Sequence, residues 1–135
     1  LKKLFNELEK NNFKETKTNK KEYRPWGNFK TIHISDSFTV KILTIYPNSQ
    51  ISLQYHKNRS EHWIITKGIA NITKGDQTFI LKEDEVTFIK KEEIHRIENK
   101  EKFDLVIVEV QTGEKISEND IIRLDDIYGR VSKNK

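Results

Sequence analysis

Short β-rich runs of residues, separated by turn-forming residues, constrain the fold of this chain more than any other feature. The dividing residues include Gly68, the pair Gly75 and Asp76, and the pair Asn99 and Lys100. Many short strands without intervening helical segments predict an all-β sandwich or barrel. The expected strands cover residues 28–35, 38–46, 50–56, 62–67, 70–74, 77–81, 85–89, 95–98 and 103–112.

The two ends of the chain differ from this β-rich middle. Apolar residues recur at helical spacing in the opening dozen residues. They are followed by a stretch of Lys, Asn, Glu and Thr that has almost no apolar residues. The acidic stretch 118–126 is expected to form a short helix or a turn that packs on the outside. We therefore expect an N-terminal helix and linker over residues 1–22, one globular domain over 23–130 and a C-terminal tail over 131–135.

Composition limits the function classes that fit this chain. The 135 residues include no cysteine, so a metal must be held by nitrogen and oxygen, and a reducing cytoplasm is the expected location. No apolar run is long enough to cross a bilayer, so no membrane association is expected. The net charge of +4 comes mainly from scattered lysines without a basic stripe, which argues against nucleic-acid binding.

Four polar residues on three expected strands have the chemistry of a metal site. Gln54 and His56 lie at positions i and i+2 of one strand and therefore share a face. Glu61 begins the next strand, and His95 begins a later one. Imidazole and carboxylate ligands suit zinc, manganese, iron or cobalt, and a glutamine oxygen adds a neutral ligand. The sequence predicts a divalent metal at these four residues, with zinc preferred.

The spacing of these residues resembles the two motifs of the cupin family, whose fold is a double-stranded β-helix or jelly-roll barrel. The first motif is matched by the metal-site residues 54, 56 and 61 and by Gly68, with glutamine in place of the first histidine. The second motif is matched by His95 and Asn99, but its glycine, proline and glycine positions hold Asp84, Lys90 and Glu92. The path of the loop over 84–93 is therefore left open.

Longer segments resemble one cupin family in particular, the type II phosphomannose isomerase domain. That domain forms the C-terminal part of bifunctional mannose-1-phosphate guanylyltransferase/mannose-6-phosphate isomerases. The resemblance implies metal-dependent interconversion of mannose 6-phosphate and fructose 6-phosphate for the synthesis of GDP-mannose and polysaccharides. It does not imply guanylyl transfer, because this chain has no glycine-rich nucleotide-binding segment. The matching segments are 24–27, 54–63, 95–99, 118–123 and 126–130.

The resemblance also suggests roles for residues around the metal. Glu61 and Arg59 are the expected catalytic residues, and Arg59 is the first choice to contact the substrate phosphate. Lys67 and Arg130 are further candidates for substrate binding, although Arg130 could instead tie the chain end to the barrel. A surface salt bridge is the competing interpretation of Arg59. The catalytic base is left open among Lys67, Glu98 and Lys41.

Two other functions compete with the isomerase. One is a non-catalytic cupin that binds a sugar phosphate or regulates a mannose-1-phosphate guanylyltransferase, an interpretation favoured by the altered second motif. The other is a different cupin enzyme, such as an epimerase or an oxygenase. A homodimer formed edge to edge through an added N-terminal strand is the expected assembly. His62 is expected to point away from the metal, as a packing residue.

Overall fold

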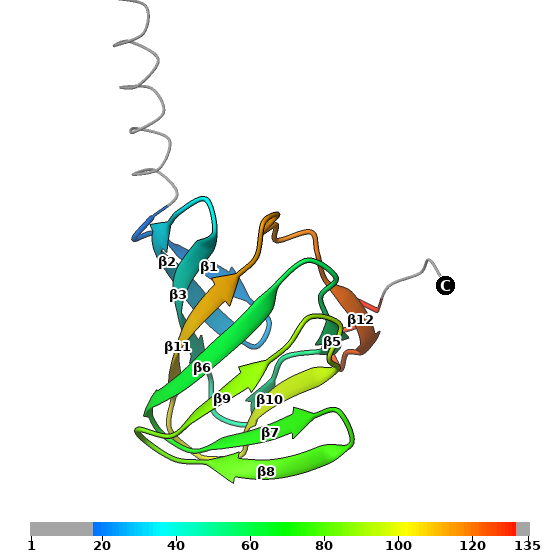
Figure 1. The fold of residues 1–135 in the computed structure, drawn as a ribbon. Helices are drawn as coiled ribbons and strands as arrows, with labels where there is room; N and C mark the ends of the chain where they lie inside the picture. The colour runs from blue at the N-terminus through cyan, green and yellow to red at the C-terminus, as the bar shows by residue number, and fades with distance from the viewer. Residues whose placement is uncertain (1–17, 132–135) are drawn as a thin grey trace, which may run out of the picture.

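The structure is a computed structural model that describes residues 18–131, and within them every regular element is a β-strand (Figure 1). The all-β prediction is therefore confirmed, whereas the predicted N-terminal helix lies outside the described residues. No helix of the described part has the length and apolar character needed to cross a membrane. The strands are β1 (Lys21–Arg24), β2 (Gly27–Ile34), β3 (Phe38–Ile45), β4 (Ser49–Gln50), β5 (Leu53–Tyr55), β6 (Ser60–Lys67), β7 (Ala70–Lys74), β8 (Gln77–Leu81), β9 (Val86–Ile89), β10 (His95–Asn99), β11 (Leu105–Thr112) and β12 (Ile122–Asp125).

The strands form two antiparallel sheets. One sheet has the order β1-β2-β3-β11-β6-β9, and the other has the order β12-β5-β10-β7-β8, with the short β4 paired to β10. Neighbours in space are often distant in sequence, as where β11 lies between β3 and β6. β1 occupies an edge of its sheet, and edge-to-edge dimerisation stays a prediction.

The C-terminal stretch corrects one prediction. The stretch 118–126 was expected to be a helix or an outer turn, but its second half is the strand β12, which pairs with β5. Ile122 lies opposite Tyr55, and Arg123 lies opposite Gln54. The helix prediction was wrong because the β-branched Ile122 suits a strand, and β5 would otherwise expose an unpaired edge. This pairing carries the C-terminal segment to the metal-site strand.

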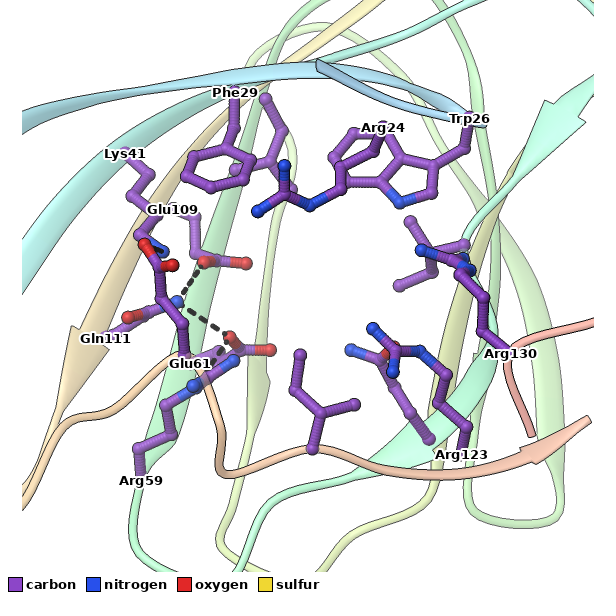
Figure 2. A pocket seen from close by; sticks show the side chains of 15 residues that line it. Arg24, Trp26, Phe29, Lys41, Arg59, Glu61, Glu109, Gln111, Arg123 and Arg130 are labelled. Atoms are coloured by element: carbon purple, nitrogen blue, oxygen red, sulfur yellow. Dashed lines mark hydrogen bonds and ion pairs between the residues drawn. The ribbon is translucent and has the colours of Figure 1, made fainter. Parts of the chain in front are cut away.

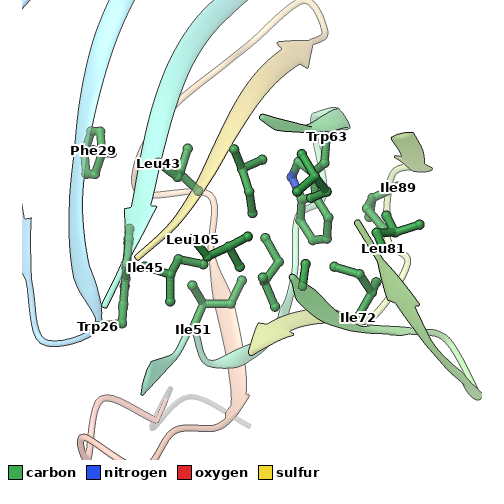
Figure 3. Packing of buried hydrophobic residues seen from close by; sticks show 14 residues of the cluster. Trp26, Phe29, Leu43, Ile45, Ile51, Trp63, Ile72, Leu81, Ile89 and Leu105 are labelled. Carbon is green, nitrogen blue, oxygen red and sulfur yellow. The ribbon is translucent and has the colours of Figure 1, made fainter. Parts of the chain in front are cut away.

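A single apolar core fills one part of the space between the sheets (Figure 3). The buried residues of β11 show where the core ends. Leu105 and Ile107 belong to the core, and the next two buried residues on the same face of the strand are the polar Glu109 and Gln111. The inner face of this strand thus changes from apolar to polar along its length. The core comprises Trp26, Phe29, Leu43, Ile45, Ile51, Trp63, Ile65, Ala70, Ile72, Leu81, Ile89, Ile97, Leu105 and Ile107.

Asn99, the last residue of the second motif, has a structural role. Its side chain is fully buried, and its amide nitrogen donates to the carbonyl oxygens of Ile45, Tyr46 and Phe103 at 2.9, 3.2 and 2.8 Å. Its amide oxygen accepts the backbone N–H of Glu101 at 3.0 Å. Because a buried amide must be hydrogen-bonded to be stable, this residue fixes the end of β3 against the turn between β10 and β11.

The loop over 84–93 keeps the backbone that the missing glycines would favour. Asp84 has φ 70° and Glu92 has φ 67°, in the left-handed region where glycine is normally found. The loop also supports the metal-site histidines, because the N–H of Glu92 donates to the carbonyl of His56 at 2.7 Å. The loop therefore has a glycine-like backbone at Asp84 and Glu92 although neither residue is glycine.

This conformation predicts that glycine at position 92 will stabilise the fold. Glu92 is exposed, and an L side chain in the left-handed region is strained, so Glu92→Gly should stabilise the chain by about 0.5–1 kcal/mol. Thermal unfolding should show a midpoint a few degrees higher. Lys91→Gly is the matched control, since this exposed neighbour is not in the left-handed region, and it should not raise the midpoint. Equal midpoint shifts for both variants would contradict the strain argument.

Candidate metal centre

The two sheets bring the predicted metal ligands to one place between them. Gln54 lies on β5 and His56 follows its end, while His95 opens β10 directly opposite Gln54 in the register. Glu61 comes from the other sheet, as the second residue of β6. The first three residues thus share one wall, and Glu61 approaches them from the facing wall.

Three of these side chains form a compact, buried cluster. The ligand atoms of His56, Glu61 and His95 all lie within 4.8 Å of one another. Each Nε2 atom of the two histidines is 3.3 Å from the same oxygen, Oε1 of Glu61. The three residues are 2%, 2% and 0% exposed, which is unusual for ionisable groups unless they are paired or bind a metal.

The outer nitrogens of both imidazoles are held by backbone carbonyls. Nδ1 of His56 donates to the Asp120 carbonyl at 2.6 Å, and Nδ1 of His95 donates to the Glu93 carbonyl at 2.8 Å. In neutral imidazoles these bonds leave the lone pairs on Nε2, which face the cluster. Nε2 of His95 is buried and has no hydrogen-bond partner within residues 18–131. The donor set therefore fits a divalent cation held by His56, Glu61 and His95.

Gln54 lies beside this cluster as its fourth member. Its Nε2 is 3.5 Å from Nε2 of His56, and its Oε1 accepts a hydrogen bond from Ser52 at 2.5 Å. A half-turn of the amide would direct Oε1 to the cluster and let Nε2 donate to the Ser52 hydroxyl. Gln54 can thus supply a neutral oxygen ligand without losing its own support.

The histidines determine the charge of Glu61. Burial raises the pKa of its carboxyl, but His56 and His95, each with Nε2 3.3 Å from Oε1 of Glu61, outweigh burial and hold the pKa well below the usual value. The carboxylate therefore stays ionised at neutral pH. An ionised carboxylate with two imidazoles is the ligand set that a divalent metal requires.

Arg59 lies next to the cluster and is almost fully buried. Its Nη1 donates to the Ser117 carbonyl at 2.7 Å, and its Nε is 3.4 Å from Oε2 of Glu61. Its Nη2 is 3.4 Å from Nε2 of His56. The residue is 4% exposed, so the interpretation as a surface salt bridge is wrong. Its charge instead faces the metal ligands.

A pocket opens in front of Gln54 and Glu61 (Figure 2). Arg123 and Arg130 lie on the side opposite Glu61, and Arg24 extends from above with its guanidinium 5.0 Å from the centre of the Phe29 ring. Trp26 and Phe29 form an apolar wall. The pocket is lined by Arg24, Trp26, Phe29, Lys41, Leu43, Ile51, Gln54, Arg59, Glu61, Glu109, Gln111, Glu118, Ile121, Arg123 and Arg130.

The arginine side of the pocket is built to hold an anion. Asp126 accepts two side-chain hydrogen bonds from Arg130, at 2.7 and 3.2 Å, which fix the guanidinium. Burial, together with the charges of Arg130 and Arg24, lowers the pKa of Arg123. Crowded guanidinium groups repel one another, so a bound anion would relieve this repulsion.

Several sequence-predicted residues lie elsewhere. Lys67 is exposed at the far end of β6, six residues from Glu61, and does not line the pocket, so the structure does not support it as a substrate ligand or base. Glu98 does not line the pocket either. His62 is exposed on the outer face of β6 with its ring 4.7 Å from Phe88, which confirms that it points away from the metal ligands.

Sequence reasoning missed Glu109 and Gln111. Gln111 donates to Glu109 at 2.6 Å and lies 3.4 Å from Oε2 of Glu61, so its amide connects the two carboxylates. Alternation along the strand could not identify them, because Val106, Val108 and Val110 make the opposite face look like the core face. The detectable signal was an acid in the middle of an otherwise apolar strand.

Comparisons with known proteins show the family to which this chain belongs. The profile of the family described as "Mannose-6-phosphate isomerase C-terminal" matches residues 11–126. The chain is 39% identical over 98% of its length to the alginate biosynthesis protein AlgA of Pseudomonas aeruginosa, covering 28% of that protein. It is 41% identical over 87% of its length to the xanthan biosynthesis protein XanB of Xanthomonas campestris, covering 25% of it. A mannose-1-phosphate guanylyltransferase of Salmonella muenchen is 40% identical over 96% of the chain, which covers 27% of that relative. The chain thus spans about a quarter of these relatives.

Solved structures confirm the cupin fold. An oxalate decarboxylase of Lactobacillus farciminis superposes with a TM-score of 0.68 over 78% of this chain and 33% of its own, at 21% identity. The cupin domain of Schizosaccharomyces pombe Cnp3 has a TM-score of 0.64 over 68% of both chains, at 16% identity. These likenesses concern the fold alone.

The site predicts that His95, but not His62, is needed for metal binding. After dialysis with Zn²⁺ or Mn²⁺, elemental analysis should find about one metal per chain in the parent protein and in His62→Gln, because His62 lies on the outer face. His95→Gln should lose most of the metal, since it removes a buried ligand nitrogen. Metal at 100 times its dissociation constant should stabilise the parent by about 2.7 kcal/mol and leave His95→Gln unchanged. Equal metal content in His95→Gln and His62→Gln would show that His95 is not a metal ligand.

Proposed function

Because this chain belongs to the mannose-6-phosphate isomerase C-terminal family, we propose that it is a metal-dependent isomerase that interconverts mannose 6-phosphate and fructose 6-phosphate. One observation carries the proposal: Glu61, which forms a cluster with His56 and His95, and the arginines 123 and 130 line opposite sides of one pocket. An isomerase acting on this sugar phosphate must hold C1 and C2, between which the single carbonyl moves, at one end of the substrate and the phosphate at the other.

The metal cluster supports the reacting end. A divalent cation, preferably zinc, with manganese, cobalt or iron as alternatives, supplies positive charge near the oxygens on C1 and C2. His56, Glu61, His95 and Gln54 would hold it. Arg59 adds a buried guanidinium next to Glu61 and His56, where it can donate to a substrate oxygen on which negative charge develops.

The arginine side supports the phosphate end. The sequence favoured Arg59 for the phosphate, but Arg59 lies among the metal ligands, and Arg130 lies across the pocket with Arg123. We therefore assign the phosphate to Arg130 and Arg123, and the sugar oxygens to Arg59. Asp126 holds Arg130 in place, which lowers the entropy lost when the phosphate binds.

Other readings of the site have less support. The non-catalytic alternative drew on the altered second motif, yet Asp84 and Glu92 keep the glycine-like backbone of that loop. Guanylyl transfer, named for the Salmonella relative, is not assigned here, because this chain covers 27% of that protein and has no glycine-rich nucleotide-binding segment. The names of the alginate and xanthan relatives support a place in polysaccharide biosynthesis.

The isomerase is tested by direct turnover. The metal-loaded chain should convert mannose 6-phosphate to fructose 6-phosphate, measured by an enzyme-coupled or NMR assay, and removal of the metal with a chelator should abolish conversion. Mannose without phosphate should be a poor substrate. A fully metal-loaded chain that binds mannose 6-phosphate without converting it would instead support the non-catalytic alternative.

The phosphate assignment predicts a selective loss of substrate binding in Arg130→Gln. Losing a charge-assisted hydrogen bond of about 1.5–3 kcal/mol should raise the KM for mannose 6-phosphate by roughly 10–100-fold. Metal content should stay unchanged. Arg96→Gln is the matched control, because Arg96 is bonded to Asp125 and the Ile51 carbonyl and does not line the pocket. An unchanged KM in Arg130→Gln would contradict the assignment of the phosphate to Arg130.

A further inference from the structure

Glu109 is a buried carboxylate in the pocket that neither the metal cluster nor the arginine group uses. It lies in the middle of β11, is 5% exposed and lines the same pocket as Glu61. Burying a carboxyl group is costly unless its oxygens are hydrogen-bonded. An acid kept at such a position, on a strand whose other inward residues include Leu105 and Ile107, needs an explanation beyond packing.

Two hydrogen bonds orient the Glu109 carboxylate. Its Oε2 accepts the indole N–H of Trp63 at 3.0 Å, and its Oε1 accepts the amide of Gln111 at 2.6 Å. The same amide nitrogen lies 3.4 Å from Oε2 of Glu61, so a single side chain separates Glu109 from a metal ligand. The carboxylate is therefore held in a fixed orientation in the pocket that Glu61 also lines.

From these contacts we propose that Glu109 is the group that moves the proton between C1 and C2 of the sugar phosphate. The inference rests on the proposed isomerase function. Glu109 removes the proton from C2 of the open-chain aldose, and the C2–H electron pair forms the C1–C2 double bond while the C1 carbonyl oxygen takes the negative charge. The protonated Glu109 then returns the proton to C1, the O2 hydroxyl proton passes to O1, and O2 becomes the ketose carbonyl.

The other ionisable residues of the pocket suit this task less well. Glu61 is engaged by two histidines and belongs to the metal ligand set. Lys41 lies 4.4 Å above the Phe29 ring and 3.7 Å from Glu118, so its ammonium group is already engaged. Proton transfer requires a group that is close to the carbons and can both accept and release a proton near neutral pH.

The surroundings of Glu109 give it that property. Burial, and next the charge of Glu61, raise its pKa to about 7, against the opposing charges of Lys41 and Arg59 and the hydrogen bond from Gln111. The pKa of Glu61 is shifted in the opposite direction. Two neighbouring carboxyls with pKa values pushed apart are typical of sites that divide ligand and acid-base roles between them.

Substitution of Glu109 tests the proposal on the full, metal-loaded chain. Glu109→Gln removes the titrating group and should lower kcat by about 10²–10⁴-fold, with metal content and the KM for mannose 6-phosphate within a few-fold of the parent. Glu98→Gln is the matched control, because this glutamate lies outside the pocket, and it should keep the parent kcat. Glu109→Asp should retain part of the activity with a larger primary isotope effect for mannose 6-phosphate deuterated at C2.

A second variant tests the same carboxylate through its neighbour. Trp63→Phe removes the indole donor that stabilises the ionised form of Glu109, so the acidic limb of the kcat/KM profile should move to higher pH, by on the order of one unit. The charged groups that face Glu109 from other elements are Lys41 on β3, Glu61 on β6 and Arg59 before β6, with Glu118 paired to Lys41. None of these groups is altered in the variant.

The outcomes separate the two proposals. A parent chain that binds metal and substrate but shows no turnover would overturn the isomerase function and, with it, the role of Glu109. If the parent is active, either of two results would overturn the role of Glu109 alone. One is a kcat of Glu109→Gln within about threefold of the parent, and the other is an acidic limb of the kcat/KM profile that does not move in Trp63→Phe. If Glu109→Gln does not fold, the role of Glu109 is tested by the primary isotope effect in Glu109→Asp and by the acidic limb of the kcat/KM profile in Trp63→Phe.

Discussion

The rest of the site depends on one buried interaction, the approach of two imidazole nitrogens to a single oxygen of Glu61, each at 3.3 Å. A carboxylate with almost no exposure is costly to bury, and this cost is offset only when positive charge meets it. The histidines come from one sheet and Glu61 from the other, so the interaction also fixes how the two walls meet. Carbonyls of Asp120 and Glu93 hold the histidines, which ties the C-terminal segment and the loop over 84–93 to the same point.

The pocket in front of this interaction is divided electrically. Guanidinium groups of Arg123 and Arg130 lie on one side, and the carboxylates of Glu61 and Glu109 lie on the other, together with Arg59 and Lys41. A substrate with a phosphate at one end and a carbonyl at the other suits such a division. Because the site is largely desolvated, each of these charges acts more strongly than it would in water. Burial raises the pKa of both glutamates, and only Glu61 has the two histidines that lower it again, which separates a ligand from an acid-base group.

Much of this arrangement could be predicted from the sequence, and the exceptions have physical reasons. The strand pattern predicted the all-β fold, and the spacing of Gln54, His56, Glu61 and His95 predicted which residues converge, because strand alternation fixes the face of each side chain. Spacing says nothing about how far along a strand a pocket extends, so Lys67 was taken as a ligand although it lies at the far end of β6. Glu109 and Gln111 were missed because their positions depend on the pairing of β11 with β6, which joins segments distant in the chain.

The central claim is that one pocket holds a metal at Glu61 and a sugar phosphate between that metal and the arginines. The most direct test is a crystal structure of the chain with Mn²⁺ or Zn²⁺ and mannitol 6-phosphate, which lacks the carbonyl and cannot isomerise. Anomalous scattering should place the metal about 2.0–2.2 Å from Nε2 of His56, Nε2 of His95 and a carboxylate oxygen of Glu61. The phosphate should contact Arg130 or Arg123. A metal bound away from these three residues, or a phosphate bound outside the pocket, would contradict the account.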